Sequence, residues 1–263
     1  MLSLPRTLLA SPSLADAALL SHTEQGRAWP LLVWAPGPGV RMVSSAVLGG
    51  GIGERAWVLN AQVPPGYDRL DPVAHLRALA SGAGLEGPGV GLMTAASVEN
   101  RRHAADGGAE ALVTAGIGVR GWAAVPGAGG VAAPRPGTIN IIVSLPVPLT
   151  DAALVNAVAT ATEAKVQALV ELGADASGTP TDAVCVAAPA PSSAGSDGGS
   201  TAESAAAPSV APSVASPVAP PFSDSFAESI AESFAGPRSL WGARLARAVH
   251  RATYEACAGL VGA

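Results

Sequence analysis

The chain has 263 residues, which is enough for one large domain or two small ones with a sizeable core. Charged residues make up only 13% of the chain and the formal net charge is −5, which argues against nucleic-acid binding through a basic surface. Aromatic residues make up only 4%, which argues against a platform on which nucleic-acid bases stack.

Short apolar runs bounded by Gly or Pro predict strands, which in chain order are 31–35, 42–48, 56–62, 91–95, 111–119, 138–145 and 182–187. Helical spacing of apolar residues predicts helices at 72–81, 98–105 and 151–172. Strands and helices do not alternate regularly along the chain. We therefore expect an α+β fold in a single domain, with helices covering a mixed or largely antiparallel sheet.

The helix that begins at Asp151 has the clearest ends. Thr150 is a suitable N-cap, and Gly173 is a suitable residue to terminate the helix. One face at helical spacing carries Val155, Val158, Thr162, Val166 and Leu169, and we expect the helix to be largely buried.

Residues 189–221 are rich in Pro, Ala and Ser and contain no Lys or Arg. Such a segment cannot bury enough apolar surface to offset the entropy lost on ordering, so we expect a disordered insertion that extends to about residue 235. The predicted organisation is a main body at 1–188, the insertion at 189–235, and a C-terminal helix within 236–263 that packs back on the body. One face of this helix carries the apolar residues Trp241, Leu245, Val249, Ala252 and Ala256. Another face carries Arg244, Arg247 and Arg251, and this basic face is either solvated or binds an anionic ligand.

No run of about 18 apolar residues is present, so we expect no membrane span. Residues 1–20 are interrupted by prolines and Asp16 and lack the apolar region of a secretory signal. Cys185 and Cys257 are the only cysteines and suggest no disulfide framework, which favours a cytoplasmic protein. No Cys-x-x-Cys or His-Glu-x-x-His spacing is present, so we expect no metal site. Heavy use of Ala and Gly is typical of GC-rich bacterial coding.

Polar clusters lie at the ends of several predicted strands, where binding and catalytic sites are often built. A glycine-rich run at 49–55 is followed by Asn60, and Thr94 ends the strand at 91–95. Thr138 and Asn140 alternate with apolar residues and so point to the same side of their strand. The turn before the last predicted strand concentrates Gly178, Thr179, Pro180, Thr181 and Asp182.

Two charged residues, Glu163 and Lys165, lie within the long predicted helix. They are two positions apart and therefore do not form a helical ion pair with each other. On a largely buried helix each needs a partner elsewhere, either as an ion pair at the helix rim or as part of a site.

In this order, the clusters resemble the adenosylcobinamide amidohydrolase family of cobamide salvage. The resemblance runs from about residue 40 to the C-terminus, without the insertion. The residues that carry it are Asn60, Gly91-Leu92-Met93-Thr94-Ala95-Ala96, Gly137-Thr138-Ile139-Asn140, Thr162-Glu163-Ala164-Lys165, Gly178-Thr179-x-Thr181-Asp182 and Trp241-Gly242.

The resemblance implies a hydrolase that cleaves the amide between aminopropanol and a propionate arm of the corrin ring. Adenosylcobinamide would become adenosylcobyric acid and 1-amino-2-propanol. It also implies that the corrinoid is the substrate and not a catalytic cofactor. From composition we expect no nucleic-acid partner and no membrane span, and we expect no other cofactor, although any metal requirement stays open. The resemblance leaves the oligomeric state open.

Amide hydrolysis requires an activated nucleophile, an oxyanion site and an acid for the leaving amine. Asp182 or Glu163 is our candidate base, Asn140 or Asn60 the oxyanion donor, and Lys165 the source of positive charge or a proton. The candidate substrate-binding residues are Asn60, Thr94, Thr138, Thr179 and Thr181. One of the threonines is alternatively a nucleophile, for which self-cleavage before Thr138 is conceivable.

Two other functions stay open from the sequence. The same Gly, Thr and Asn clusters suit a non-catalytic corrinoid-binding or regulatory module, in which Glu163 and Lys165 are structural. The chain is also compatible with an amidohydrolase that acts on another substrate.

Overall fold

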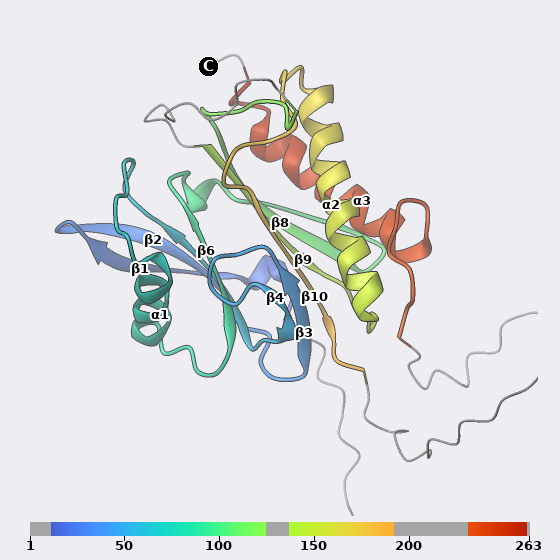
Figure 1. The fold of residues 1–263 in the computed structure, drawn as a ribbon, viewed down its shortest axis with the longest axis horizontal. Helices are drawn as coiled ribbons and strands as arrows, with labels where there is room; N and C mark the ends of the chain where they lie inside the picture. The colour runs from blue at the N-terminus through green and yellow to red at the C-terminus, as the bar shows by residue number, and fades with distance from the viewer. Residues whose placement is uncertain (1–11, 125–136, 192–230, 262–263) are drawn as a thin grey trace, which may run out of the picture.

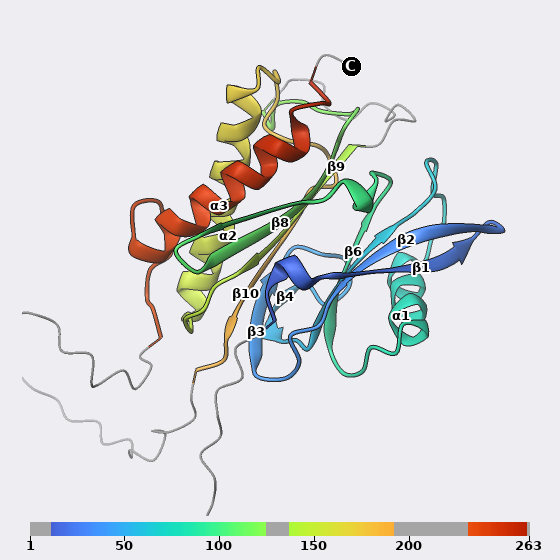
Figure 2. The same ribbon diagram turned by 180° about the vertical axis from the view of Figure 1, so that it is seen from behind.

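Four layers make up the fold, in the order helix, sheet, sheet, helices. The computed structural model describes residues 12–124, 137–191 and 231–261. Helix α1 (Pro72–Gly82) covers a four-stranded sheet, and helices α2 (Asp151–Glu171) and α3 (Leu240–Cys257) cover a six-stranded one, as Figures 1 and 2 show from opposite sides. The two sheets face each other between these helices.

The four-stranded sheet has the order β1-β2-β5-β6, and all its pairs are antiparallel except β5 with β6. Its strands are β1 (Ala18–Glu24), β2 (Arg27–Trp34), β5 (Trp57–Gln62) and β6 (Gly89–Thr94). Helix α1 forms the crossover that a parallel pair requires, because it connects β5 to β6.

The six-stranded sheet has the order β4-β3-β10-β9-β8-β7, and only β9 and β10 are parallel. Its strands are β3 (Val40–Ser44), β4 (Gly51–Glu54), β7 (Arg102–Asp106), β8 (Ala109–Ile117), β9 (Gly137–Ser144) and β10 (Ala183–Pro189). Helix α2 connects β9 to β10. Because these two strands are parallel, both begin at the same end of the sheet.

Strand periodicity explains how one sheet contributes to two core layers. In β9, Ile141 and Val143 contact the layer under α2 and α3, whereas Ile142 between them faces the other sheet. In β10, Val184 and Cys185 divide in the same way. Such central strands read as continuous apolar runs because both of their faces are buried. The α+β, single-domain and mixed-sheet prediction is confirmed.

The predicted helix at 98–105 is wrong. Val98–Asn100 forms only a short 3-10 turn, and Arg102–Asp106 is strand β7, which pairs with β8. The two strands are joined by Gly107 and Gly108, both with positive φ. A two-residue Gly-Gly connection between apolar runs favours a β-hairpin. This signal outweighs the weak helical pattern, and the segment forms a strand. Edge strands β1 and β4 were also not predicted.

The buried face of α2 differs from the predicted one. Val155 is 58% exposed and Thr162 is exposed, whereas a row of small residues is buried against the sheet and α3. That row includes Ala153, Ala157, Ala161, Ala164 and Ala168. Small side chains let helix backbones approach closely, so alanines rather than valines mark the buried face here.

The C-terminal helix packs against the body as its apolar stripe predicts. Trp241, Leu245 and Val249 are buried in the core layer under α2 and α3. On the basic face, Arg247 Nη2 lies 2.6 Å from Asp106 Oδ1 of β7, and the Arg244 guanidinium lies over the Trp241 ring at 4.6 Å. The hydrogen bond from Arg247 lowers the pKa of Asp106.

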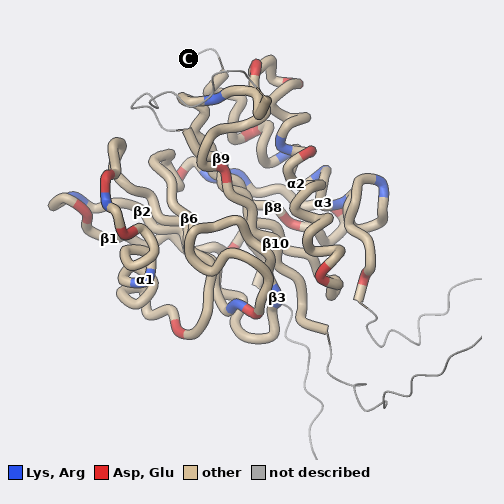
Figure 3. Tube along the Cα trace, viewed as in Figure 1, with Lys and Arg blue, Asp and Glu red and all other residues tan. Residues whose placement is uncertain are grey.

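Most of the predicted insertion at 189–235, namely 192–230, lies outside the described residues. Residues 231–235, at the end of the predicted insertion, already contact the body. Thr150 N donates to Glu232 O at 3.0 Å, and Thr160 Oγ1 donates to Ala235 O at 2.7 Å. Lys and Arg positions are interspersed with Asp and Glu positions along the described trace in Figure 3. None of the helices in the described parts of the chain is long and apolar enough to cross a membrane.

Candidate active site

A cavity of about 560 Å³ lies where the strands of the two sheets end, and several predicted site residues line it. Its walls come from the end of β6, the beginning of β9, the turn before β10 and the segments after β3 and β5. The predicted residues among them are Thr94, Thr138, Asn140, Thr181 and Asp182. Cavities of roughly 300–1,000 Å³ are typical of small-molecule sites.

A larger cavity of about 950 Å³ lies at β1, β2 and α1. Its wall contains many apolar residues and none of the predicted site residues. Catalysis requires polar groups that converge on one point. The smaller cavity is therefore the better candidate for the active site, although the other cavity has the larger volume.

Asp182 is the centre of a dense hydrogen-bond network at the cavity wall. Its Oδ1 accepts from Ile139 N at 2.8 Å and from Thr179 Oγ1 at 2.5 Å. Its Oδ2 accepts from Thr179 N at 3.1 Å and from Lys165 Nζ at 2.5 Å. A carboxylate has about four lone-pair sites, so this network uses all of them.

Lys165 reaches this network from the buried side of α2, where it is only 7% exposed. Its ammonium forms an ion pair with Asp182, which resolves the question of its partner. Glu163 does not join it. Residues two positions apart point about 200° apart on a helix, and Glu163 lies on the exposed face and not on the cavity wall. We therefore leave Glu163 out of the site.

Two threonine hydroxyls meet at the peptide carbonyl of Gly137, and a third contacts one of them. Thr179 Oγ1 lies 2.7 Å and Thr181 Oγ1 2.9 Å from Gly137 O, and both hydroxyls are placed to donate to it. Thr138 Oγ1 lies 2.5 Å from Thr181 Oγ1. Thr179 has one hydroxyl proton for two acceptors, Gly137 O and Asp182 Oδ1, so the proton can serve only one of them at a time.

Asn140 and Asn60 join the two sheets across the buried layer between them. Asn140 Nδ2 donates to Asn60 Oδ1 at 2.9 Å and to Met93 O at 3.1 Å. Asn60 Nδ2 donates to Thr114 Oγ1 at 2.9 Å. The Met93 carbonyl can only accept, so the orientation of the Asn140 amide is fixed.

This arrangement changes the role available to the two asparagines. Both Nδ2 protons of Asn140 are already donated, so it has no N–H for an oxyanion. Its Oδ1 is buried without a hydrogen-bond partner in the described structure. Asn60 does not line the cavity and lies behind Asn140. Asn140 therefore presents an acceptor rather than a donor.

Other residues contribute less directly. Thr94 Oγ1 accepts from Ala96 N at 2.9 Å and so shapes the segment after β6. Cys185 and Cys257 are free and buried, and burial raises the pKa of each thiol to about 12, which makes them poor nucleophiles.

Ser45 and Tyr67 also line the cavity but were not predicted. Both belong to the segments that follow β3 and β5. Nothing in their local sequence marks these segments as cavity walls. The pairing of β3 with β10 brings Ser45 near β9, and the association of the two sheets brings Tyr67 there.

Comparisons with known proteins agree on one family. The family described as adenosylcobinamide amidohydrolase matches residues 16–209. A relative from Methanosarcina mazei named adenosylcobinamide amidohydrolase is 36% identical over 143 residues, which are 54% of this chain and 67% of the relative. No solved structure matches the chain. The match over most of its length shows that this chain belongs to the adenosylcobinamide amidohydrolase family of hydrolases.

Proposed function

We propose that this chain hydrolyses the amide that joins aminopropanol to a propionate arm of adenosylcobinamide. The products are adenosylcobyric acid and 1-amino-2-propanol, and the acid then serves cobalamin salvage. The corrinoid is the substrate in this proposal, not a cofactor, and the cytoplasm is the expected location. The observation that carries the proposal is the convergence of Thr138, Thr181, Asp182 and Asn140 on one cavity in a chain of this family.

The size of the cavity favours entry of the reacting arm alone. At about 560 Å³ it suits a ligand of moderate size, whereas a complete adenosylated corrinoid is considerably larger. We therefore propose that the aminopropanol arm enters toward Thr138 and Asp182, while the ring remains outside at the mouth.

The reaction forms a bond from a water oxygen to the amide carbon and breaks the carbon–nitrogen bond. We propose that the Thr138 and Thr181 hydroxyls hold the attacking water and that Asp182 takes its proton. The proton enters at the Oδ1 lone pair that becomes free when the Thr179 hydroxyl donates to Gly137 O instead. The Lys165 ammonium does not itself line the cavity and acts through Asp182, 2.5 Å away, whose carboxylate it keeps charged and in place. The leaving amine then receives the proton from Asp182.

The Thr179 hydroxyl allows Asp182 to accept this proton without loss of hydrogen bonds. Before proton transfer Thr179 Oγ1 donates to Asp182 Oδ1. After transfer the protonated carboxyl can donate to Thr179 Oγ1, which then donates to Gly137 O at 2.7 Å. A network that is satisfied in both protonation states suits a general base.

Asn140 suits recognition of the substrate amide. Its buried Oδ1 lacks a partner, and an unpaired buried acceptor is unfavourable until a donor arrives. The amide N–H of the substrate arm is such a donor. We propose that this hydrogen bond orients the amide for attack.

The test is incubation of the purified full chain with adenosylcobinamide, followed by mass spectrometry for both products. Wild type and Glu163→Gln should give both, and Asp182→Asn should give at least about 100-fold less, in the range of a lost acid–base group. Corrinoid binding without products would favour a binding module. Equal turnover by Asp182→Asn and wild type would contradict the assigned site.

A further inference from the structure

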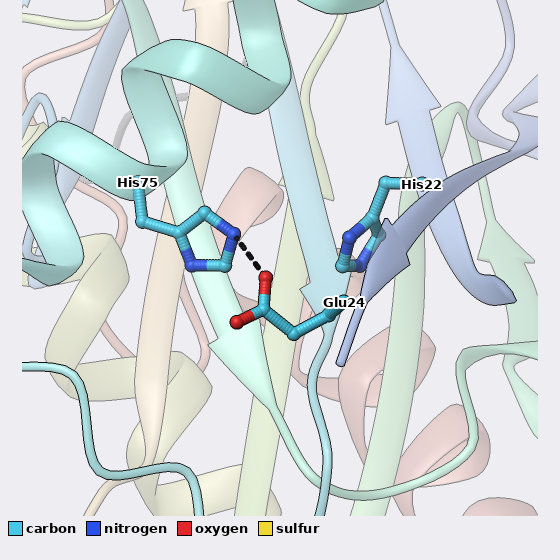
Figure 4. A group of neighbouring side chains, drawn as sticks. All are labelled: His22, Glu24 and His75. Atoms are coloured by element: carbon cyan, nitrogen blue, oxygen red, sulfur yellow. Dashed lines mark ion pairs between the residues drawn. The ribbon is translucent and has the colours of Figure 1, made fainter. Parts of the chain in front are cut away.

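Three side chains with metal-binding atoms converge between strand β1 of the four-stranded sheet and helix α1. None of them belongs to the residues assigned to hydrolysis. His22 and Glu24 are two positions apart on β1, so they share one face, and His75 comes from α1 (Figure 4). One ligand atom from each lies within 4.8 Å of the others. His75 is 4% exposed and the Glu24 side chain 15% exposed.

One nitrogen of His22 is left without a partner. Its Nε2 lies 2.8 Å from the backbone carbonyl of Gln62, which can only accept, so Nε2 carries the proton. The other nitrogen, Nδ1, therefore has a free lone pair, and it is buried with no hydrogen-bond partner in the described structure. An imidazole that donates one N–H to a carbonyl and presents the other nitrogen has the form of a metal ligand.

His75 has the corresponding arrangement. Its Nε2 lies 3.1 Å from Glu24 Oε2, and its Nδ1 lies 2.9 Å from the Tyr67 hydroxyl. A phenol both donates and accepts, so Tyr67 can support His75 whether or not Nε2 carries a proton.

Arg69 is the positive group nearest to this cluster. Its Nη1 lies 3.9 Å from Glu24 Oε2, beyond a hydrogen bond. Its Nε and Nη2 instead donate to the two oxygens of Asp71 at 3.1 and 3.3 Å. Asp71 therefore offsets the charge of Arg69, and Glu24 keeps a carboxylate oxygen for another cation.

We propose that His22 Nδ1, Glu24 and His75 Nε2 bind a divalent transition-metal ion such as Zn²⁺. Two imidazoles and one carboxylate are a familiar zinc ligand set that leaves a fourth position for water. Ligands about 2.0–2.2 Å from a tetrahedral ion lie roughly 3.3–3.5 Å apart. The 3.1 Å separation between His75 and Glu24 is near this value, so closure of the site requires mainly a small movement of His22.

The position of the site gives it a connection to the cavity at β9. Tyr67, which supports His75, also lines that cavity. His22 lines the larger cavity at β1 and α1, which offers the ion a path from solvent. The sequence predicted no metal site because the ligands come from separate elements, 22–24 and 75, and match no local spacing motif.

The test measures metal binding directly, on untagged full-length protein stripped with a chelator. Zn²⁺ is titrated in competition with a chromogenic chelator, and Co²⁺ is added separately to record its visible spectrum. We expect one tight Zn²⁺ per chain, and intense Co²⁺ bands between about 500 and 650 nm that report a four- or five-coordinate ion with nitrogen ligands.

Variants separate this site from adventitious binding. His22 lies on the edge strand β1, where a substitution should be tolerated by the fold. His22→Gln should lower Zn²⁺ affinity by more than about 100-fold, because loss of even a supporting partner of a metal ligand lowers affinity 10- to 100-fold. Glu24→Gln should do the same. His103→Gln is the matched control, since His103 pairs with Glu110 at 2.8 Å without a second histidine. Equal affinity in wild type and His22→Gln, or a Co²⁺ spectrum of a hexaaqua ion, would overturn the proposal.

Discussion

Lys165 Nζ lies 2.5 Å from Asp182 Oδ2, and the two side chains are only 9% and 13% exposed. The pair ties the middle of α2 to the turn before β10, which forms part of the cavity wall. Burial of two charges costs much of their hydration free energy. A pair of hydrophobic residues of similar size therefore often stabilises a fold at least as much as a buried ion pair does. A functional role at the cavity therefore explains this pair better than stability does.

Replacement of Lys165 by Met should reduce both stability and activity. The variant leaves the Asp182 carboxylate buried without its counter-ion, which typically costs about 3–5 kcal/mol. Urea unfolding followed by circular dichroism measures that cost, and product formation measures the activity. Glu163→Gln, on the exposed face of the same helix, is the control and should match wild type in both. A stable and fully active Lys165→Met would show that the ion pair is dispensable.

The double variant Lys165→Met with Asp182→Asn separates the two effects. With both charges removed, much of the stability lost in Lys165→Met should return, because no unpaired charge remains. Activity should not return, since the proposed base is absent. Recovery of both would indicate that the pair supports the fold alone.

Gly178→Ala should disturb the same pair without removal of either charge. A Cβ at this position would lie 2.5 Å from both Asp182 Oδ2 and Lys165 Nζ, closer than contacts between such atoms allow. We expect lower turnover and a lower melting temperature. Gly121→Ala is a suitable control, because Gly121 forms a bridge with Gly178 but has open space around its Cβ position. Equal loss in both variants would point to the bridge rather than to the ion pair.

The Thr138 hydroxyl should be required in an uncleaved chain. Thr138→Ala should lower turnover by about 100- to 1,000-fold, as loss of a positioned hydrogen-bonding group in an active site does, and Thr138→Ser should keep most of it. Intact mass should give a single 25.8 kDa species for active wild type. Two fragments that meet between Gly137 and Thr138 would instead assign the reaction to a threonine freed by self-cleavage.

The sequence predicts the elements that carry local signals. The helix from Asp151 follows from its cap at Thr150 and its Gly173 terminus, and β9 and β10 follow from apolar runs bounded by Gly or Pro. The turn at 178–182 is a candidate site from the sequence because two hydroxyls and a carboxylate lie together in a turn formed by Gly and Pro. These features need only neighbours in the chain.

What the sequence did not predict depends on contacts between distant segments. Asn60 and Asn140 are 80 residues apart, and their hydrogen bond exists only because two sheets face each other. The structure places Glu163 away from the cavity for a related reason: which side of α2 is buried depends on the alanines that contact α3 and the sheet. The histidines at 22 and 75 meet only after β1 and α1 come together.

Thiol-modifying reagents should leave the native enzyme active. Burial raises the pKa of Cys185 and of Cys257 to about 12. A thiol with such a pKa is a thiolate in only about one molecule in ten thousand at pH 8, and the thiolate is the form that iodoacetamide attacks. We expect full turnover after exposure to iodoacetamide at pH 8, with no mass increase. Under denaturing conditions both thiols should react, which provides the positive control. Rapid loss of activity with alkylation of one cysteine in the native state would show that a thiol is accessible and would return Cys185 or Cys257 to the list of candidate nucleophiles.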